Sequence, residues 1–518
     1  MPYTRGMRLF IVSSAFLFFA STLSAADEVK VTPMLPDPVE VKAAMKKAAS
    51  FYRSEVAFLG GYAWKWPKDM SIAKGEDHSS GTLIMIQPPG TPAMGLTFLR
   101  AYQVTGDKLY LQAAREAASA LMWCQLASGG WGSDFDFNPQ LARKYHYRRD
   151  IEAGDTDRGT RHASTTLDDQ KTQTALLFLL ELAHEPACVD DKPLHDALKF
   201  GLEGLLAAQA PNGGWPQHYS GPADASAPVK SGALPKEWPR IWPNLDYRGY
   251  YTLNDGNILY VVRLLLRTHE LEKDERFLQA AKKAGDFLLL ACLPQPQPAW
   301  AQQYNRDMEP VWARKFEPPA VSSAESAGAV RTLLDLWIAT GDEKYLKPIK
   351  PALAWLQKSK LPDGHWARFY ELGTNKPLYC KKDTYELTFE DKDLPTHYGF
   401  KTEEDFARDL EKLTADLAAP RDELLRKKES PETEKSWSSQ AKGQAAKVNA
   451  ALKSLDSKGR WIKDDLIDAG EFVKNFKAMS SYLEGAQKGG ETFEALVKSV
   501  KREKEMETTK ALLNPTPR

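Results

Sequence analysis

The sequence predicts an all-α fold: an α/α toroid, or incomplete α/α barrel of helix-pair repeats, with a charged helical C-terminal extension. A unit of amphipathic helix, short glycine- or proline-containing loop and tryptophan recurs along the chain, and a partner helix lies between successive copies. No stretch shows the sustained alternation of a half-buried strand. Helix pairs of this kind bury their apolar faces only by stacking. Because the tryptophan loops all follow the same helix of a pair, we expect them at one end of the toroid.

The repeat can be followed through most of the chain. The unit ends on a tryptophan in four clear copies and in one weaker, earlier copy, namely Trp131, Trp215, Trp300, Trp366 and the weaker Trp64. The partner helices are predicted within residues 91–107, 165–185, 253–270 and 322–342. In the third of these, apolar residues at helical spacing form one stripe, made of Ile258, Val261, Val262 and Leu265. Such a stripe is typical of a helix that packs on one face.

Residues 1–26 have the pattern of a secretory signal peptide. Arg5 and Arg8 precede an apolar run over residues 9–20, and small residues follow as far as Ala25 and Ala26. The apolar run is short for a membrane span, so we expect a secreted or periplasmic protein with no membrane span after signal removal. The 4 cysteines are far apart and form no C-x-x-C pair. This spacing argues against a zinc site or a disulfide scaffold and leaves room for one or two disulfides.

Charge and composition divide the rest of the chain near residue 400. We expect an α/α toroid over residues 27–400 and a charged helical extension over residues 401–518, which either packs on the toroid or binds a partner. The 69 basic and 69 acidic side chains balance. Bulk charge therefore names no partner, and no nucleic acid is expected.

Two partner helices open with acidic residues. Asp168 and Asp169 lie in TTLDDQ, and Asn254 and Asp255 lie in TLNDGN. Aspartate and asparagine are common helix N-caps, which is one interpretation. Because the two sites occupy corresponding helices of adjacent repeats, they should lie close together. Clustered carboxylates with an amide oxygen suit Ca²⁺, and they equally suit the acid–base pair of a glycosidase.

Cationic and aromatic residues gather in the predicted tryptophan loops. The loop over residues 300–317 is long and chemically varied for a connection between two helices. It contains Gln302, Arg314 and Lys315, while GGWPQHY adds Trp215 as an aromatic platform. Residues 366–383 contain a predicted hairpin and the further cations Arg368, Lys381 and Lys382. A cation-rich cleft with its own carboxylates fits a polyanionic ligand bridged by a metal.

These motifs in their order resemble polysaccharide lyase family 10, the α/α-toroid pectate lyases. The resemblance covers roughly residues 45–400 and includes TTLDDQKTQTALLFL, TLNDGNILYVVRLL, PVWARKFEPPAVSSAES and ARFYELGTNKPLY. It implies calcium-dependent cleavage of α-1,4-polygalacturonate by β-elimination with an arginine as general base. By position, Asp168 and Asp255 match the metal-site aspartates and Arg314 matches the base. Lys381 or Lys382 stands where the family usually has arginine, and residues 221–246 form an insertion.

Other functions remain open at this point. An α/α-toroid glycoside hydrolase could use Asp168 and Asp255 as its carboxylate pair. A non-catalytic protein could use the same cations to bind an acidic polysaccharide. Arg314 could also clamp a substrate carboxylate rather than accept a proton, since arginine has a reference pKa of about 12.5 to 13.8.

Overall fold

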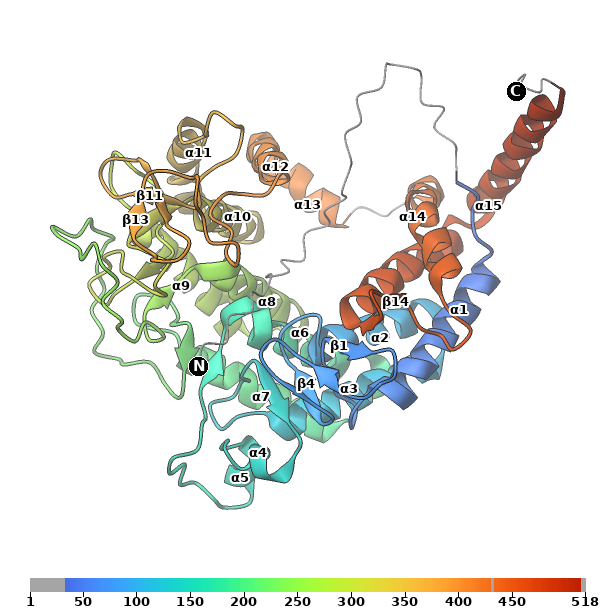
Figure 1. Ribbon diagram of the computed structural model, residues 1–518, viewed down its shortest axis with the longest axis horizontal. Coiled ribbons are helices and arrows are strands. Elements are labelled where there is room, and N and C mark those ends of the chain that lie inside the picture. Colours follow the sequence, from blue (N-terminus) through green and yellow to red (C-terminus); the bar gives the residue numbers. More distant parts are fainter. Residues whose placement is uncertain (1–32, 430–432, 514–518) are drawn as a thin grey trace.

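The computed structural model describes residues 33–429 and 433–513, and its helices form an arc of stacked pairs (Figure 1). One helix of each pair belongs to a first series whose members pack side by side in the order α15, α2, α6, α8, α10. These are α2 (Thr91–Thr105), α6 (Lys171–Ala183), α8 (Asn257–Glu272), α10 (Ser323–Thr340) and α15 (Ala469–Leu513). The arc is the predicted incomplete α/α toroid, because each pair buries its apolar stripes against its neighbours.

The other helix of each pair belongs to a second series. Its members are α1 (Pro38–Phe51), α3 (Lys108–Cys124), α7 (Lys192–Ala207), α9 (Glu275–Ala291), α11 (Ile349–Lys358) and α14 (Glu434–Ser454). Four of them begin after an aspartate whose carboxylate accepts a hydrogen bond from a first-turn N–H, namely Asp37, Asp107, Asp191 and Asp274. These caps satisfy N–H groups that the helix itself cannot pair.

The recurring tryptophans fasten each loop to the helix before it. The indoles of Trp131, Trp215 and Trp366 each donate a hydrogen bond to the backbone carbonyl ten residues earlier, at 2.6–2.9 Å. Trp300 does the same across twelve residues, to Leu288. Because all four rings are buried, the indole N–H needs this partner. The repeated tryptophans therefore fix the loop of each repeat to the helix before it.

The first copy of the unit differs from the prediction by two residues. The prediction placed its aromatic residue at Trp64, but Tyr62 is the buried ring after the Gly60–Gly61 pair. Gly60 has a φ of +85°, and a Cβ there would lie 2.2 Å from the carbonyl oxygen of Glu116. Trp64 is only partly buried and donates to the Gln87 carbonyl. In this copy the diglycine marks the repeat position, and a tyrosine takes the place of the tryptophan.

The C-terminal region is helical and packs on the toroid. The short helices α12 (Phe406–Ala418) and α13 (Arg421–Glu429) lie against α10, at one end of the arc. At the other end, α14 and α15 pack on α1 and α2. Trp461 follows α14 and donates to the carbonyl of Ala451, ten residues earlier. Residues 434–489 are therefore a further copy of the repeat. The sequence analysis had assigned them to the charged helical extension.

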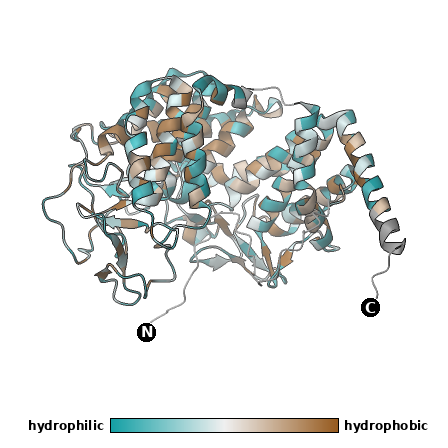
Figure 2. Ribbon diagram, turned by 90° about the horizontal axis from the view of Figure 1, so that it is seen from above, coloured by the Kyte–Doolittle hydropathy of each residue, from teal (hydrophilic) through white to brown (hydrophobic). Residues whose placement is uncertain are grey.

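Short antiparallel strands join the loops at one side of the arc, below the helices in Figure 2. One sheet has the order β14 (Ile462–Lys463), β15 (Leu466–Asp468), β1 (Lys65–Pro67), β2 (Ala73–Lys74), β3 (Ser79–Ser80). A second has the order β10 (Ala320–Ser322), β11 (Phe369–Glu371), β12 (Pro377–Cys380), β13 (Leu387–Thr388). Three strand pairs complete the set: β4 (Leu83–Met85) with β5 (Asp134–Asp136), β6 (Thr165–Thr166) with β7 (His218–Tyr219), and β8 (Tyr251–Thr252) with β9 (Gln303–Tyr304). The hairpin predicted within residues 366–383 is β11–β12.

Smaller features complete the fold. Two short helices, α4 (Pro139–Ala142) and α5 (Arg148–Glu152), lie between β5 and β6. All four cysteine thiols are free. Among the described residues, no helix combines the length and the apolarity that a membrane crossing needs. The predicted signal peptide lies outside the described residues.

Candidate active site

The acidic residues lie in two matching turns that precede α6 and α8. These turns are the 3₁₀ segments η2 (Asp168–Gln170) and η4 (Asn254–Gly256). Asp169 and Asp255 occupy equivalent positions, with left-handed φ angles of 47° and 50°. Neither turn supplies a side-chain cap to the helix that follows it. The N-cap interpretation is therefore wrong for these residues. A left-handed conformation costs a non-glycine residue about 1–3 kcal/mol and tends to occur at functional sites.

The two turns bring three carboxylates together. One oxygen from each of Asp168, Asp169 and Asp255 lies within 4.8 Å of the others. Asn254 donates its amide to Asp168 at 3.3 Å and to Asp255 at 2.7 Å, and so links the turns. Ca²⁺–oxygen distances are about 2.3–2.6 Å, so ligands on opposite sides of one ion can be about 4.8 Å apart. The three carboxylates therefore fit one calcium ion.

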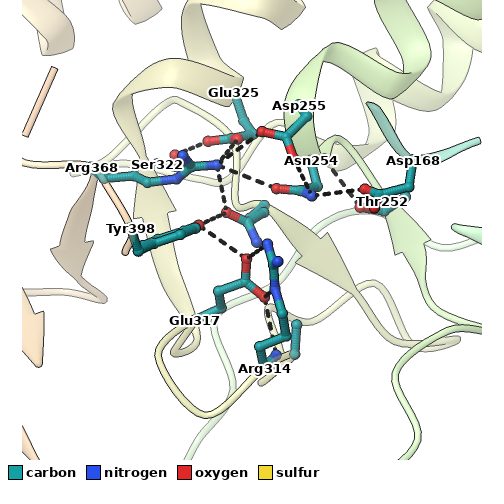
Figure 3. Close-up of polar contacts among 12 residues, drawn as sticks. Asp168, Thr252, Asn254, Asp255, Arg314, Glu317, Ser322, Glu325, Arg368 and Tyr398 are labelled. Atoms are coloured by element: carbon teal, nitrogen blue, oxygen red, sulfur yellow. Dashed lines mark hydrogen bonds and ion pairs between the residues drawn. The ribbon is translucent and has the colours of Figure 1, made fainter. Parts of the chain in front are cut away.

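Cations surround this acidic group on two sides. The buried Lys171 ammonium lies 3.4 Å from Asp168 and 3.3 Å from Asp169. From the other side, Arg368 Nη2 lies 3.0 Å from Glu325 and 3.5 Å from Asp255. The same nitrogen also reaches the Asn254 and Gln302 side-chain oxygens, as Figure 3 shows for Asn254. The acidic group is thus held between a local lysine and an arginine from a distant part of the chain.

Arg314 lies beside this acidic group and forms an ion pair with the buried carboxylate of Glu317. Its Nε and Nη2 both contact the Glu317 carboxylate, at 2.9 and 2.5 Å, and its backbone N–H donates to the same carboxylate. Tyr398 donates to Glu317 at 3.0 Å (Figure 3). Nη1 has no hydrogen-bond partner among the residues that the structure describes, and the Arg314 side chain is 34% exposed. One edge of the guanidinium is therefore fixed while the other can meet a ligand.

Burial and neighbouring charges set the protonation of the site. Burial raises the pKa of Asp255 to about 7, although the Arg368 guanidinium opposes the shift. Burial also raises the pKa of Asp169, and the Asp168 charge adds to it. For Asp168, burial is outweighed by Lys171 and Arg314, so its pKa is lowered.

The arginine at the site is held in its charged form. Burial alone would lower the pKa of Arg314, but the Glu317 carboxylate outweighs burial and raises the pKa above the ordinary value. The pKa of Glu317 is lowered, because Arg314 more than offsets its burial. The ion pair thus favours arginine as a cation and glutamate as an anion.

The remaining predicted site residues fall into two groups. Gln302 and Arg368 belong to the polar cluster, by which we mean the three carboxylates and the hydrogen-bonded polar side chains around them. Arg368 Nε and Gln302 Nε2 are buried without a hydrogen-bond partner in the described part of the chain. Lys315 lies outside that cluster, with its ammonium over the Tyr385 ring at 3.8 Å. Exposed Lys381 pairs with Glu386 at 2.8 Å, and Lys382 is also exposed. Neither of these two lysines has a contact with the polar cluster among the described residues.

The expectation of Trp215 as an aromatic platform is corrected by the structure. Its ring is 0% exposed, and its indole is hydrogen-bonded to the Leu205 carbonyl. The residue is the buried tryptophan of its repeat and presents no ring face to a ligand.

Several polar residues of the cluster were not among the predicted site residues. They are Lys171, Glu317, Glu325 and Tyr398. Asp169 and Asn254 were singled out with the acidic turns but were given no role of their own, and Lys171 belongs to the same DDQK motif, so the matching turns were a usable signal. Glu317 stands three residues after Arg314, a separation that a loop can use for an ion pair. Nothing in the sequence around Tyr398 indicates its place.

Comparisons with known proteins agree with the resemblance. Residues 136–365 match the family model described as pectic acid lyase, and no curated protein matches the chain. Among solved structures, a variant of the family 10 polysaccharide lyase from Cellvibrio cellulosa, in complex with trigalaturonic acid, is 18% identical, with a TM-score of 0.43 over 63% of this chain and 99% of that chain. The same lyase in another structure is 19% identical, with a TM-score of 0.41 over 62% and 95%. A GH76 alpha-mannanase from Bacteroides thetaiotaomicron is 12% identical, with a TM-score of 0.42 over 87% and 99%.

The matched segment contains both acidic turns and the loop that carries Arg314 and Glu317. It ends shortly before Arg368, which completes the cluster from outside it. Residues 136–365 are therefore similar to the pectic acid lyase family, the kind of protein that the resemblance implied.

Proposed function

We propose that the protein is a calcium-dependent pectate lyase that cleaves α-1,4-polygalacturonate by β-elimination. The observation that carries the proposal is the group of three carboxylates within reach of one ion, flanked by Arg314 and Arg368, inside a pectic acid lyase segment. A polygalacturonate chain carries one carboxylate per sugar. Calcium on the aspartates and two arginines beside them would match that regular negative charge.

Asp168, Asp169 and Asp255 would hold the ion, and Asn254 would keep their two turns in register. When bound, calcium would neutralise the sugar carboxylate and make the neighbouring C5 proton more acidic. Arg368 Nε and Gln302 Nε2 are buried donors without a described partner. Buried donors are normally paired, so these two are suited to hold the same sugar carboxylate or a ring hydroxyl.

Arg314 is the proposed base. In the reaction a base takes the C5 proton, the electron pair forms the C4–C5 double bond, and the C4–O4 bond breaks with its electrons going to O4, which then takes up a proton. Nη1 of Arg314 is suited to accept the C5 proton, because Glu317 already occupies Nε and Nη2. Deprotonating an ordinary arginine at pH 7 costs about 7–9 kcal/mol.

The Glu317 ion pair adds to that cost, because it raises the pKa of Arg314. This supports a strong rise of activity with pH if Arg314 is the base. It also keeps open the role of Arg314 as a charged clamp for a substrate carboxylate. The two roles differ in their response to a lysine substitution, which keeps the charge but loses the planar guanidinium.

A secreted or periplasmic location completes the proposal. Its support is the signal-peptide pattern of residues 1–26 together with a polymeric substrate that cannot enter a cell intact.

One assay tests the proposed function. The protein is incubated with polygalacturonate, with and without calcium, and both the absorbance of the 4,5-unsaturated product and new reducing ends are followed. A pectate lyase gives both signals, and a chelator removes both. Reducing ends without the unsaturated product would indicate hydrolysis, and binding without either signal would indicate a non-catalytic protein.

A further inference from the structure

We propose an additional subsite for a uronate unit of the polygalacturonate chain, in a cavity beside the loop over residues 300–317, which we call the Arg314 loop. The cavity has a volume of about 570 Å³, and its lining includes Arg240, Trp242, Lys315, Tyr385 and Phe389. Ligand sites commonly occupy about 300–1,000 Å³. This inference rests on the proposed function, because it assigns the cavity to the same substrate.

The insertion over residues 221–246 forms one wall of the cavity and is fixed to the Arg314 loop. Trp242 Nε1 donates to the Ala313 carbonyl at 2.8 Å, and Trp312 Nε1 donates back to the Pro239 carbonyl at 2.7 Å. These two hydrogen bonds cross between the insertion and the loop in opposite directions. The wall is therefore a defined surface whose position is tied to the residue before Arg314.

The charges in the cavity leave one cation available. Arg240 is neutralised by Glu371 at 2.6 Å, and Glu386 is neutralised by Lys381 at 2.8 Å. Lys315 is exposed and contacts the Tyr385 ring, and it has no acidic partner among the residues that the structure describes. The cavity thus offers one ammonium beside aromatic and aliphatic side chains.

A uronate unit matches that combination. Its carboxylate can pair with the Lys315 ammonium, and its C–H ring face can lie against Trp242 or Phe389, whose side chain is 49% exposed. A neutral sugar would leave the ammonium without a partner, and a small inorganic anion would leave the apolar lining without one. Charge complementarity therefore favours an acidic sugar.

The cavity lies beside the chain segments that form the proposed cleavage site. Lys315 follows Arg314 directly, and the sheet containing β11, which begins next to Arg368, ends in β13 at the cavity. A polymer held by Arg314 and Arg368 would reach the cavity with a neighbouring sugar. The subsite would therefore favour chains that are long enough to occupy both places.

The test is the dependence of kcat/KM on the length of oligogalacturonides from about two to about eight units, so that the shortest chains leave a cavity of this size empty and the longest can fill it. For the wild type we expect a stepwise rise at the length that fills the cavity. Lys315→Gln and Phe389→Ala should reduce that step by about two- to fivefold, the effect of one partly exposed contact. Lys347→Gln removes an exposed lysine elsewhere and is the matched control.

The outcomes separate this inference from the proposed function. Equal losses at every length, or no loss, would overturn the subsite while leaving the lyase intact. Phe389 follows β13 and is not part of the loop that contains Arg314, so its variant controls for an effect of Lys315→Gln that is transmitted through that loop. If the wild type gives no unsaturated product, the proposed function fails. In that case the subsite is tested by calorimetry with hexagalacturonate that has no double bond. Weaker binding by both Lys315→Gln and Phe389→Ala would support the subsite, and unchanged binding would reject it.

Discussion

Two repeats of this molecule share one construction, and only one of them contributes to the proposed active site. In the first, Trp215 is fastened to the Leu205 carbonyl and the chain continues to α8. In the second, Trp461 is fastened to the Ala451 carbonyl and the chain continues to α15. Both enter their helix through an aspartate-containing segment. The difference between them lies in the few residues before the helix begins.

Asp468 acts as an ordinary cap at α15, because it accepts hydrogen bonds from the backbone N–H groups of Gly470 and Glu471. Asp255 caps nothing; the extra left-handed turn of η4 aims its carboxylate at Asp168, Asp169 and Arg368. The repeat therefore fixes where the turn lies, and the left-handed turn brings the Asp255 carboxylate to the other two carboxylates. An aspartate at a helix start is informative only when its turn frees it from capping.

The largest effect is expected from Asp255→Asn. Asparagine also tolerates a positive φ, so the turn should persist while one proposed calcium ligand loses its charge. Losing several kcal/mol of transition-state stabilisation would lower kcat/KM by about 10³-fold or more. Asp468→Asn is the matched control in the other repeat, and its turnover should stay at the wild-type level. The measurement is unsaturated-product formation at saturating calcium, together with thermal unfolding. Retained activity in Asp255→Asn would remove the distinction between the two repeats.

The next effect is expected at Arg314. If Nη1 accepts the C5 proton, Arg314→Lys should lower kcat by about 10²-fold or more, nearly as much as Arg314→Ala, because the ammonium cannot reproduce the guanidinium geometry. Wild-type kcat should rise about tenfold per pH unit above neutrality until another step limits, since a raised pKa leaves little neutral arginine at pH 7. The profile is measured from about pH 7 to 11 with calcium saturating. A wild-type kcat with a raised KM in Arg314→Lys would make Arg314 a clamp. The base would then be sought among the other residues at the carboxylates, because Lys315, Lys381 and Lys382 have other partners or positions in the structure.

The fold could be predicted because its signals are local and repeated. Helical spacing, aspartate caps and a tryptophan after each second-series helix follow from neighbouring residues, so the toroid emerged from the sequence. Trp461 follows its helix in the same way, but the high charge of the surrounding segment hid the periodicity. Tyr62 was missed because a tyrosine replaced the marker while the diglycine remained.

The site could be predicted only in part, for a related reason. Asp168, Asp255 and Arg314 lie in recognisable motifs, and the structure gathers the two acidic turns and places Arg314 beside them. Tyr398 reaches Glu317 across 81 residues, and Arg368 reaches Asp255 across 113 residues. Contacts of that range depend on the stacking of complete repeats. The prediction of Trp215 as an aromatic platform was wrong, because its ring is buried in the core between the stacked repeats.

A smaller effect should distinguish the two acidic turns from each other. Lys171 places a positive charge next to Asp168 and Asp169, whereas η4 has no lysine at the corresponding distance within its own helix start. Because the ammonium competes with a bound cation, Lys171→Met should lower the calcium concentration for half-maximal activity by up to about tenfold, equivalent to about 1.4 kcal/mol. Lys171→Arg keeps the charge and is the control. The calcium dependence of product formation measures the effect, and an unchanged half-saturation would show that the lysine does not share the site.

The smallest effect on activity is expected from Trp461→Phe, which tests the repeat without chemistry. The substitution keeps an aromatic ring against Phe472 and Phe476 but removes the donor to the Ala451 carbonyl. Leaving a buried acceptor unpaired costs about 1–3 kcal/mol, which should lower Tm by about 1–3 °C in a chain of this length. Values of kcat and KM should not change, because no carboxylate of the site depends on this loop.

Trp215→Phe removes the same kind of bond but lies next to the site, since the Trp215 carbonyl accepts the Thr252 N–H three residues before Asp255. That variant should lose both stability and activity. A single unfolding transition shifted in both variants, with turnover changed only in Trp215→Phe, is the expected result. An unchanged Tm in Trp461→Phe would mean that residues 434–489 do not unfold together with the toroid, and equal losses of turnover would mean that both repeats support the site.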